Sequence, residues 1–313
     1  MLKGFQEELN RLVAVKVMAP HLASVAAARK RFAREARAAA AIMHPNVLPI
    51  LHVDSSGQLP FLVMPYVDCE SLQDRLDRDG ALPILDVLRI AVQVARGLAA
   101  AHAQGLVHRD VKPANILLER GVERVMLTDF GLARAVDDAT LTRSGLIAGT
   151  PHYMSPEQAR GEGVDTRSDL FSLGSVLYAM TTGRPPFRAE TTYGILRRVT
   201  DDAPRAIREH HPETPDWFEG IVLRLLHKSP DKRFSSADEI AQLLEDCLAH
   251  AQQPAAIPLP AAARALSAMK EARLFQKAGL LIASALLGVL AIAAFVIYSA
   301  WPRMMPCREF GFE

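Results

Sequence analysis

The chain has 313 residues, enough for one large domain or two ordinary ones with a core of their own. Its 36 basic and 35 acidic residues nearly cancel, so the charge gives no argument for nucleic acid as a partner, and we expect none. The three cysteines lie far apart without a CxxC spacing, which indicates neither a disulfide framework nor a zinc site.

The N-terminal part of the chain shows strand and helix patterns in close succession. Residues 12–18 form an apolar, β-branched run that predicts a strand, and the Ala- and Arg-rich residues 24–43 predict a helix. Two further strands are expected at 47–53 and 61–67, with a Ser-Ser-Gly turn between them. These elements predict a small, strand-rich lobe over residues 1–67.

The pattern becomes helical after residue 70. Apolar residues recur at helical spacing between Val87 and Ala101, and Gly105 is well placed to end that helix. Later helices are expected at 165–181, 192–200, 215–226 and 236–250. These helices predict a larger lobe over residues 68–251, followed by a linker over 252–277 that is rich in Pro and Ala as far as residue 263.

A long uncharged run lies near the C-terminus. No charged residue occurs from Ala278 to Pro302, and about 20 helical residues rising ~1.5 Å each cover a hydrocarbon core of roughly 30 Å. A buried core helix of this length would be expected to carry a polar face. The run therefore predicts a transmembrane helix over 278–301, with 302–313 as a short extracytoplasmic tail.

The orientation follows from the charges beside this run. Arg264, Lys270, Arg273 and Lys277 precede it, whereas only Arg303 and Arg308 follow. By the positive-inside rule, the N-terminal side lies in the cytoplasm. The expected localisation is the cell membrane, crossed once.

Two motifs carry the chemistry. Residues 108–115 have the sequence His-Arg-Asp-Val-Lys-Pro-Ala-Asn, and Asp-Phe-Gly follows at 129–131. Phosphoryl transfer needs an in-line nucleophile, metal ions on the phosphate oxygens and positive charge where negative charge develops. On these motifs the chain resembles the protein kinases, and it looks closest to the bacterial membrane-anchored serine/threonine kinases of the eukaryotic-like family. The resemblance covers roughly residues 5–248.

This resemblance implies roles for the residues of the two motifs. Asp110 would accept the proton of the substrate hydroxyl, and Lys112 would contact the transferred phosphate, as in Ser/Thr-specific members. Asn115 and Asp129 would hold Mg²⁺, a hard cation that carboxylate and amide oxygens suit. The predicted protein substrates therefore carry Ser or Thr acceptors.

The resemblance also implies a nucleotide site that takes ATP. Residues 13–16, Val-Ala-Val-Lys, match the strand whose lysine, here Lys16, reaches the α- and β-phosphates and pairs with a helix glutamate, here Glu35. The adenine would lie against the hinge after Met64. Its expected neighbours are backbone groups of Tyr66 and Val67 and the apolar side chains of Ala14 and Leu117.

Further residues match the scaffold and the activation segment. The resemblance implies that Glu157, in Ser-Pro-Glu, pairs with Arg233, and that Asp169 is a buried aspartate at a helix start that holds the catalytic loop. Arg109 would be a cationic partner for an activation-loop phosphate. The candidate sites for that phosphate are Thr140, Thr142 and Ser144.

One part of the kinase signature is absent from the sequence. The Gly-rich loop should precede Lys16, but only Gly4 occurs there, and residues 1–4 look like the end of the second strand of the small lobe. Either the start codon is placed too late, which we prefer because every charged residue needed for transfer is retained, or the truncation is real. The predicted fold is therefore α+β and bilobal, with a truncated small lobe, a large helical lobe and one transmembrane helix.

Three functions compete at this point. The first is a membrane-anchored Ser/Thr protein kinase that also phosphorylates its own activation loop, with a homodimer as a partner for trans-autophosphorylation. The second is a nucleotide-impaired pseudokinase or scaffold, which the missing loop alone supports. The third, a small-molecule phosphotransferase, is disfavoured because the activation segment, including Gly149-Thr150, is a protein-substrate feature.

Overall fold

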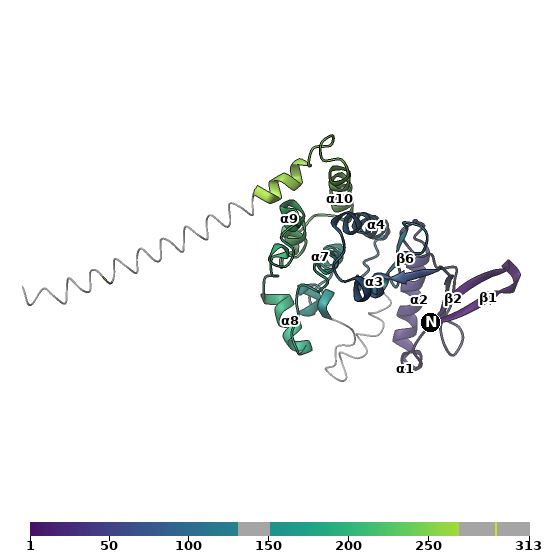
Figure 1. The fold of residues 1–313 in the computed structure, drawn as a ribbon. Helices are drawn as coiled ribbons and strands as arrows, with labels where there is room; N and C mark the ends of the chain where they lie inside the picture. The colour runs from purple at the N-terminus through teal and green to yellow at the C-terminus, as the bar shows by residue number, and fades with distance from the viewer. Residues whose placement is uncertain (131–150, 269–291, 293–313) are drawn as a thin grey trace, which may run out of the picture. The chain divides into compact units, whose positions relative to one another are not determined.

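The structure is a computed structural model that describes residues 1–130, 151–268 and 292. The chain divides into two compact units, Met1–Arg264 and Ala265–Glu313. The first unit holds all the sheets and the helices named below (Figure 1). In the second unit only residues 265–268 and Ile292 are described, and all of them are helical.

The first unit begins with a four-stranded antiparallel sheet in the order β1-β2-β4-β3. Its strands are β1 (Leu2–Gln6), β2 (Arg11–Val17), β3 (His52–Asp54) and β4 (Phe61–Pro65). The turn between β1 and β2 is a 3₁₀ turn followed by Asn10, which takes a left-handed φ of 45°. Asparagine tolerates this conformation better than most residues, so it suits the position.

Helix α2 (Ala26–Ala40) covers one face of this sheet, after the short helix α1 (Pro20–Ala23). Its buried residues recur at helical spacing, as in Phe32 and Ala36, and they pack with Met18 and Leu22 against Leu62 of β4. Burial of this apolar stripe holds the helix on the sheet. Glu35 lies on the same buried side of the helix and is 6% exposed.

A second sheet joins the two lobes and has the order β5-β6-β7. Its strands are β5 (Cys69–Ser71), β6 (Ile116–Glu119) and β7 (Val125–Leu127). The segment 46–48 is attached to β7, because Leu48 N–H donates to Leu127 O and Leu127 N–H donates to Asn46 O. The strand predicted at 47–53 is therefore reduced to β3, since its first residues bond to the other sheet.

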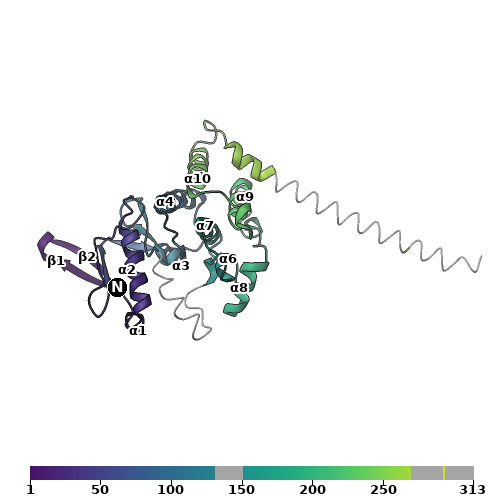
Figure 2. The same cartoon turned by 180° about the vertical axis from the view of Figure 1, so that it is seen from behind.

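The large lobe is built on helices. They are α3 (Leu72–Asp79), α4 (Ile84–Ala103), α6 (Pro156–Ala159), α7 (Thr166–Thr182), α8 (Thr192–Asp201), α9 (Asp216–Leu225) and α10 (Ala237–Gln252). Helix α7 is buried along almost its whole length, as expected for a helix with neighbours on every side. It contacts α4, α9 and α10, and both views show it inside the group of helices (Figures 1 and 2).

Two glycines allow close helix packing in this lobe. A Cβ on Gly174 would lie 2.7 Å from Leu225 Cβ, and a Cβ on Gly97 would lie 2.7 Å from Asn46 O. Real Cβ atoms do not approach other atoms so closely. Gly174 therefore lets α7 approach α9, and Gly97 lets α4 approach the segment 46–48, which is hydrogen-bonded to β7.

The C-terminal part of the first unit extends beyond the predicted lobe boundary at 251. Residues 261–268 are helical within the predicted linker 252–277, and Ala263 is fully buried. The Ala-rich sequence there favours a helix. Among the described residues no helix is both long and apolar enough to cross a membrane. The predicted span 278–301 and tail 302–313 fall outside those residues, apart from Ile292.

Candidate active site

The loop at residues 108–115 gathers three of the predicted site residues. Lys112 Nζ lies 2.6 Å from Asp110 Oδ2, and Asn115 Nδ2 donates to Asp110 Oδ2 at 2.9 Å and to the Asp110 carbonyl at 2.8 Å. The Asp110 side chain is 27% exposed and that of Lys112 is 26% exposed, so both remain accessible. The loop thus presents a carboxylate that is fixed in orientation by an amide and an ammonium group.

His108 lies fully buried beneath this carboxylate and connects the loop to the chain after β7. Its Nδ1 accepts a hydrogen bond from Asp110 N–H at 3.3 Å, so its proton is on Nε2, which donates to Thr128 O at 3.0 Å. Its ring also packs against Phe130 with 4.4 Å between the centroids. Through these contacts His108 connects Asp110 to the segment that carries Asp129.

Asp169, at the start of α7, holds the backbone of the catalytic loop. Its carboxylate is fully buried and accepts hydrogen bonds from Arg109 N–H at 2.7 Å, from His108 N–H at 2.8 Å and from His102 Nε2 at 2.8 Å. Arg109 has a φ of 67°, a strained conformation for a residue with a side chain. The predicted role of Asp169 as a buried anchor of the loop is confirmed.

Lys16 and Asp129 bring the small lobe into the site. Lys16 lies on β2, on the same face as Ala14, and its Nζ is 2.6 Å from Asp129 Oδ1. Asp129 has a φ of 67°, so two of the three described non-glycine residues with positive φ belong to this site. A strained backbone conformation persists only where the surrounding contacts hold it in place, and such conformations are found most often in functional sites.

Among the described residues, the ion pair of Lys16 is with Asp129, and the predicted pair between Lys16 and Glu35 is not found there. Lys16 pairs with Asp129, whereas the Glu35 carboxylate lies 3.6 Å from the Arg34 guanidinium. Asp129 has a left-handed φ, and its carboxylate lies within 2.6 Å of the Lys16 ammonium group. Glu35 nevertheless lies on the buried side of α2, which packs on the sheet that carries Lys16.

The residues predicted to surround adenine lie at the junction of the two sheets. Val67 and Leu117 pack against one buried cluster, formed by Leu48, Met64 and Met126. Ala14 lies opposite Met64 in the register of β2 and β4, and therefore on the same face of the sheet. Tyr66 is 41% exposed, and Lys3 Nζ lies 4.2 Å from its ring centroid. Their roles toward a nucleotide stay predictions.

The oxygen atoms at the site fit a magnesium ion that is coordinated partly by the protein and partly by phosphate oxygens. Asn115 uses its Nδ2 for the bonds to Asp110, which leaves its amide oxygen out of those bonds, and Asp129 supplies a carboxylate. Among the described residues, no three His, Cys, Asp or Glu side chains gather as a metal site. Mg²⁺ is commonly bound through one or two carboxylates with substrate phosphates, so a complete protein cage is not required.

Comparison with known proteins shows which family the chain belongs to. Residues 1–250 match the family described as protein kinase domain. The chain belongs to the protein kinase family. It is 38% identical over 256 residues to the serine/threonine-protein kinase PknB of Mycobacterium leprae, covering 80% of this chain and 40% of that relative. It is 40% identical over 239 residues to PknB of Mycolicibacterium smegmatis, covering 74% of this chain and 38% of the relative.

A solved kinase structure agrees in fold. The crystal structure of the Mycobacterium tuberculosis PknI kinase domain matches with a TM-score of 0.62 at 30% identity, covering 78% of this chain and 89% of that one. The two-lobed α+β protein kinase fold predicted from the motifs is thereby confirmed. The chain spans about two fifths of the length of the PknB relatives that it matches.

The kinase scaffold is closed by a buried ion pair. Arg233 Nη1 and Nη2 donate to the two oxygens of Glu157 at 2.7 and 2.8 Å, and Ser168 Oγ donates to Glu157 Oε1 at 2.6 Å. Burial pushes the pKa of Glu157 upward, but the bonds from Arg233 and Ser168 outweigh it and hold the pKa below its ordinary value. The predicted pair between Glu157 and Arg233 is confirmed.

Two contacts of the kinase site were not predicted from the sequence. Gln158 Nε2 donates to Arg109 O at 2.8 Å, while its Oε1 accepts from Ser155 N–H at 3.0 Å. The Ser-x-x-Gln spacing signals the capping box at α6 but not the bond to the catalytic loop. His102, the other unpredicted residue, contacts Asp169 from α4. The activation-segment candidates Thr140, Thr142 and Ser144, and Gly149-Thr150, fall outside the described residues.

Proposed function

We propose that this chain is a serine/threonine protein kinase that transfers the γ-phosphoryl group of ATP to Ser or Thr hydroxyls of proteins. The observation that carries the proposal is the fixed Asp110–Lys112–Asn115 cluster, joined to the Lys16–Asp129 pair through the bond from Thr128 N–H to Asn115 O. These groups supply a base, cations and oxygen donors within one connected set of contacts. The family membership and the names of the relatives support it.

In the proposed reaction, the substrate hydroxyl oxygen forms a bond to the γ-phosphorus while the bond from that phosphorus to the bridging oxygen breaks and ADP leaves. Asp110 takes the hydroxyl proton, and its orientation is held by Asn115 and His108. Lys112, already beside Asp110, places positive charge where the transferred group lies, and Lys16 supplies positive charge to the other phosphates.

Asn115 and Asp129 are the residues that would hold Mg²⁺. When bound, the metal ion would neutralise negative charge on the phosphate oxygens. The strained conformations of Arg109 and Asp129, held by Asp169 and by the contact with Lys16, keep the loop and this carboxylate in place before substrate binds.

We also propose that the kinase works at a membrane and phosphorylates its own activation segment, with a second copy as partner. The uncharged run 278–301 and the basic residues before it support a single membrane-spanning helix with the kinase lobes, 1–67 and 68–251, in the cytoplasm. A reporter fused after Glu313 tests the topology. Activity outside the cytoplasm is expected, whereas a cytoplasmic signal would refute the orientation.

The catalytic proposal is tested with the full chain, Mg-ATP labelled in the γ-phosphate and a generic protein substrate, beside the variant Asp129→Asn. Label on Ser and Thr of the substrate is expected for the natural chain and only background for the variant. Background incorporation in both, together with weak or absent nucleotide binding, would favour the nucleotide-impaired pseudokinase or scaffold function instead.

A further inference from the structure

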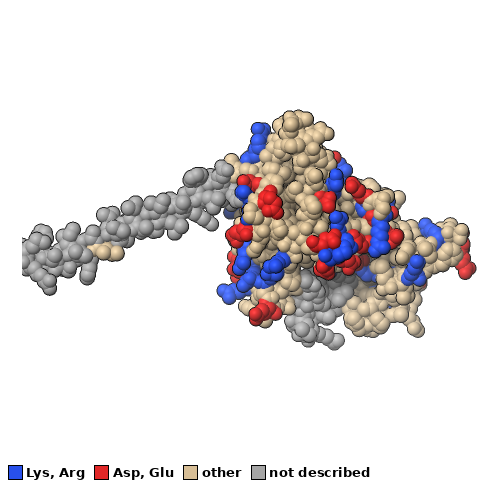
Figure 3. Space-filling model, in the orientation of Figure 1, with Lys and Arg blue, Asp and Glu red and all other residues tan. Residues whose placement is uncertain are grey.

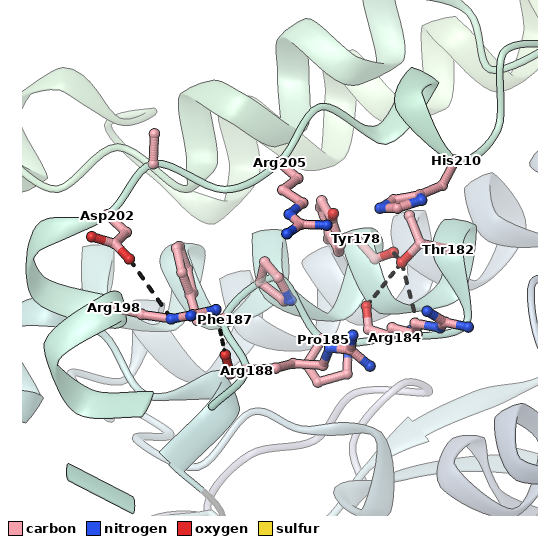
Figure 4. A pocket seen from close by; sticks show the side chains of 12 residues that line it. Tyr178, Thr182, Arg184, Pro185, Phe187, Arg188, Arg198, Asp202, Arg205 and His210 are labelled. Atoms are coloured by element: carbon pink, nitrogen blue, oxygen red, sulfur yellow. Dashed lines mark hydrogen bonds and ion pairs between the residues drawn. The ribbon is translucent and has the colours of Figure 1, made fainter. Parts of the chain in front are cut away.

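A pocket lies in the large lobe, apart from the catalytic loop. It is enclosed by the end of α7, the Gly-Arg-Pro-Pro-Phe-Arg segment at 183–188, α8 and the segment 202–210 (Figure 4). Its volume is about 350 Å³. The side chains that dominate its lining are Tyr178, Arg184, Arg188, Arg198, Arg205 and His210.

The charge of this pocket is strongly one-sided. Four arginines and one aspartate, Asp202, line it, so with neutral histidine its net charge is 4 − 1 = +3. Asp202 lies 3.8 Å from Arg198 Nε, and Arg198 Nη1 also donates to the Arg188 carbonyl at 2.6 Å. Arg198 is thus held by the wall of the pocket.

Among the described residues, the other three arginines of the pocket lack the carboxylate partner that Arg198 has. Arg184, Arg188 and Arg205 form no ion pair with a carboxylate in the part of the chain that the structure describes. Figure 4 shows Arg205 above Tyr178 and Arg188 across the pocket. The pKa of Tyr178 is raised, chiefly by burial and also by Glu209 and Glu219, while the charges of Arg205 and Arg188 act in the opposite direction.

On the face of the molecule drawn in Figure 3, by contrast, basic and acidic side chains are interspersed. Guanidinium groups gathered around one cavity repel each other, and the repulsion is relieved most effectively by an anion. Arginine presents a planar fork of donors that matches phosphate oxygens in a bidentate way. A phosphate dianion would offset two of the three net positive charges.

The size and walls of the pocket indicate a ligand larger than a free ion. A water molecule takes about 30 Å³ of liquid volume, so the pocket has room for a phosphate group with the side chain that carries it. Pro185, Pro186 and Phe187 supply apolar wall beside the guanidinium groups, and the Tyr178 and Thr182 hydroxyls add polar groups. These walls suit the stem of a side chain better than they suit a bare ion.

We propose that this pocket binds the phosphate monoester of a phosphorylated Ser or Thr side chain in a polypeptide. Its position suits a protein ligand, because α8 packs against α6 and the 3₁₀ turn Pro151–Tyr153, and α6 reaches the catalytic loop through Gln158. Along α7, Thr182 lies about 20 Å from Asp169, given ~1.5 Å per helical residue. The binding does not depend on the proposed transfer reaction, so the phosphopeptide site and the kinase activity are tested independently.

The test uses the full chain without ATP and a fluorescein-labelled alanine-based pentapeptide with phosphothreonine at its centre. Binding is followed by fluorescence anisotropy, with the unphosphorylated peptide in parallel and inorganic phosphate as competitor. The variant R188Q/R205Q removes two pocket cations, and Arg197→Gln is the control. Arg197 is 74% exposed on α8, the helix between these two arginines in the sequence, but it does not line the pocket. Thermal unfolding checks that each variant is folded.

Saturable binding of the phosphopeptide is expected, at least tenfold weaker in R188Q/R205Q and within twofold of the natural chain in Arg197→Gln. Inorganic phosphate should compete only at higher concentration than the peptide. Equal affinity in the natural chain and R188Q/R205Q, equal affinity for the unphosphorylated peptide, or competition by inorganic phosphate at the same concentration as the peptide would each overturn the proposal.

Discussion

Asp169 Oδ1 accepts a hydrogen bond of 2.7 Å from the backbone N–H of Arg109, the residue that precedes the proposed catalytic base. The same carboxylate also accepts from His108 N–H. A buried side chain on α7 thus fixes two consecutive peptide groups of the catalytic loop, one of them in a strained conformation with a φ of 67°. The position of Asp110 therefore depends on a residue that makes no contact with substrate in the proposed mechanism.

Replacing Asp169 with alanine should destabilise the fold and slow phosphoryl transfer together. The change leaves one buried and one part-buried backbone donor without their acceptor, and a buried loss of this kind is worth about 1–3 kcal/mol. We expect a loss of at least about 2 kcal/mol in urea unfolding. Asp165→Ala is the control, because Asp165 caps the same helix from an exposed position and should cost about 1 kcal/mol. Equal unfolding midpoints for Asp169→Ala and the natural chain would contradict this account.

Removing one partner of the buried Glu157–Arg233 pair should be among the most destabilising single changes. Both side chains are almost fully buried, and Arg233→Met would leave the Glu157 carboxylate without its bidentate partner, at about 3–5 kcal/mol. The exposed pair of Arg78 and Glu70 is the control, since Arg78→Met should cost at most about 1 kcal/mol. Denaturant unfolding of the two variants measures the difference, and equal costs would refute the role of burial.

The same pair predicts a dependence of stability on pH. The folded pKa of Glu157 lies below its ordinary value of 4.5, so the folded chain releases this proton more readily than the unfolded chain. The stabilisation is therefore fully present above about pH 4.5 and is lost as the pH falls through the folded pKa. The difference in unfolding free energy between the natural chain and Glu157→Gln should shrink in acid. A difference that stays constant below pH 4.5 would contradict the prediction.

The contact between α7 and α9 can be tested at Gly174. Alanine there would place its Cβ 2.7 Å from Leu225 Cβ, so the two helices must separate, at about 1–3 kcal/mol. Gly163→Ala is the control, because a Cβ at Gly163 meets nothing within 4 Å and no positive φ is involved. Thermal unfolding should show a lower midpoint only for Gly174→Ala. An unchanged midpoint for Gly174→Ala would mean that the close contact between α7 and α9 does not contribute to the stability of the fold.

Much of this scaffold follows from local sequence patterns. The strand that carries Lys16, the helix with Glu35 and the helix with Asp169 were predicted within a few residues of their bounds, because their apolar spacing reflects burial on one or all sides. The Glu157–Arg233 pair and the anchoring role of Asp169 came from the resemblance to kinases. Neither was deducible from spacing, since the partners are far apart in the sequence.

What the patterns could not give are contacts set by tertiary geometry. Lys16 pairs with Asp129, a residue with a positive φ. The sequence around Asp129 does not predict this backbone conformation. The second bond of Gln158 and the pocket around Tyr178 join residues from separate elements. The predicted strand at 47–53 was too long because its first residues form hydrogen bonds with β7 in the other sheet. Local β-propensity does not show which sheet a residue will join.

The central claim is that Asp110 is the base of a phosphoryl-transfer site. The most direct measurement compares single-turnover transfer from Mg-ATP to a protein substrate by the natural chain and by Asp110→Asn, with ATP affinity measured for both. We predict an unchanged affinity and a rate lower by about 10²–10⁴-fold, the usual contribution of a positioned acid–base group. Equal rates in the two proteins at saturating ATP would contradict the assignment.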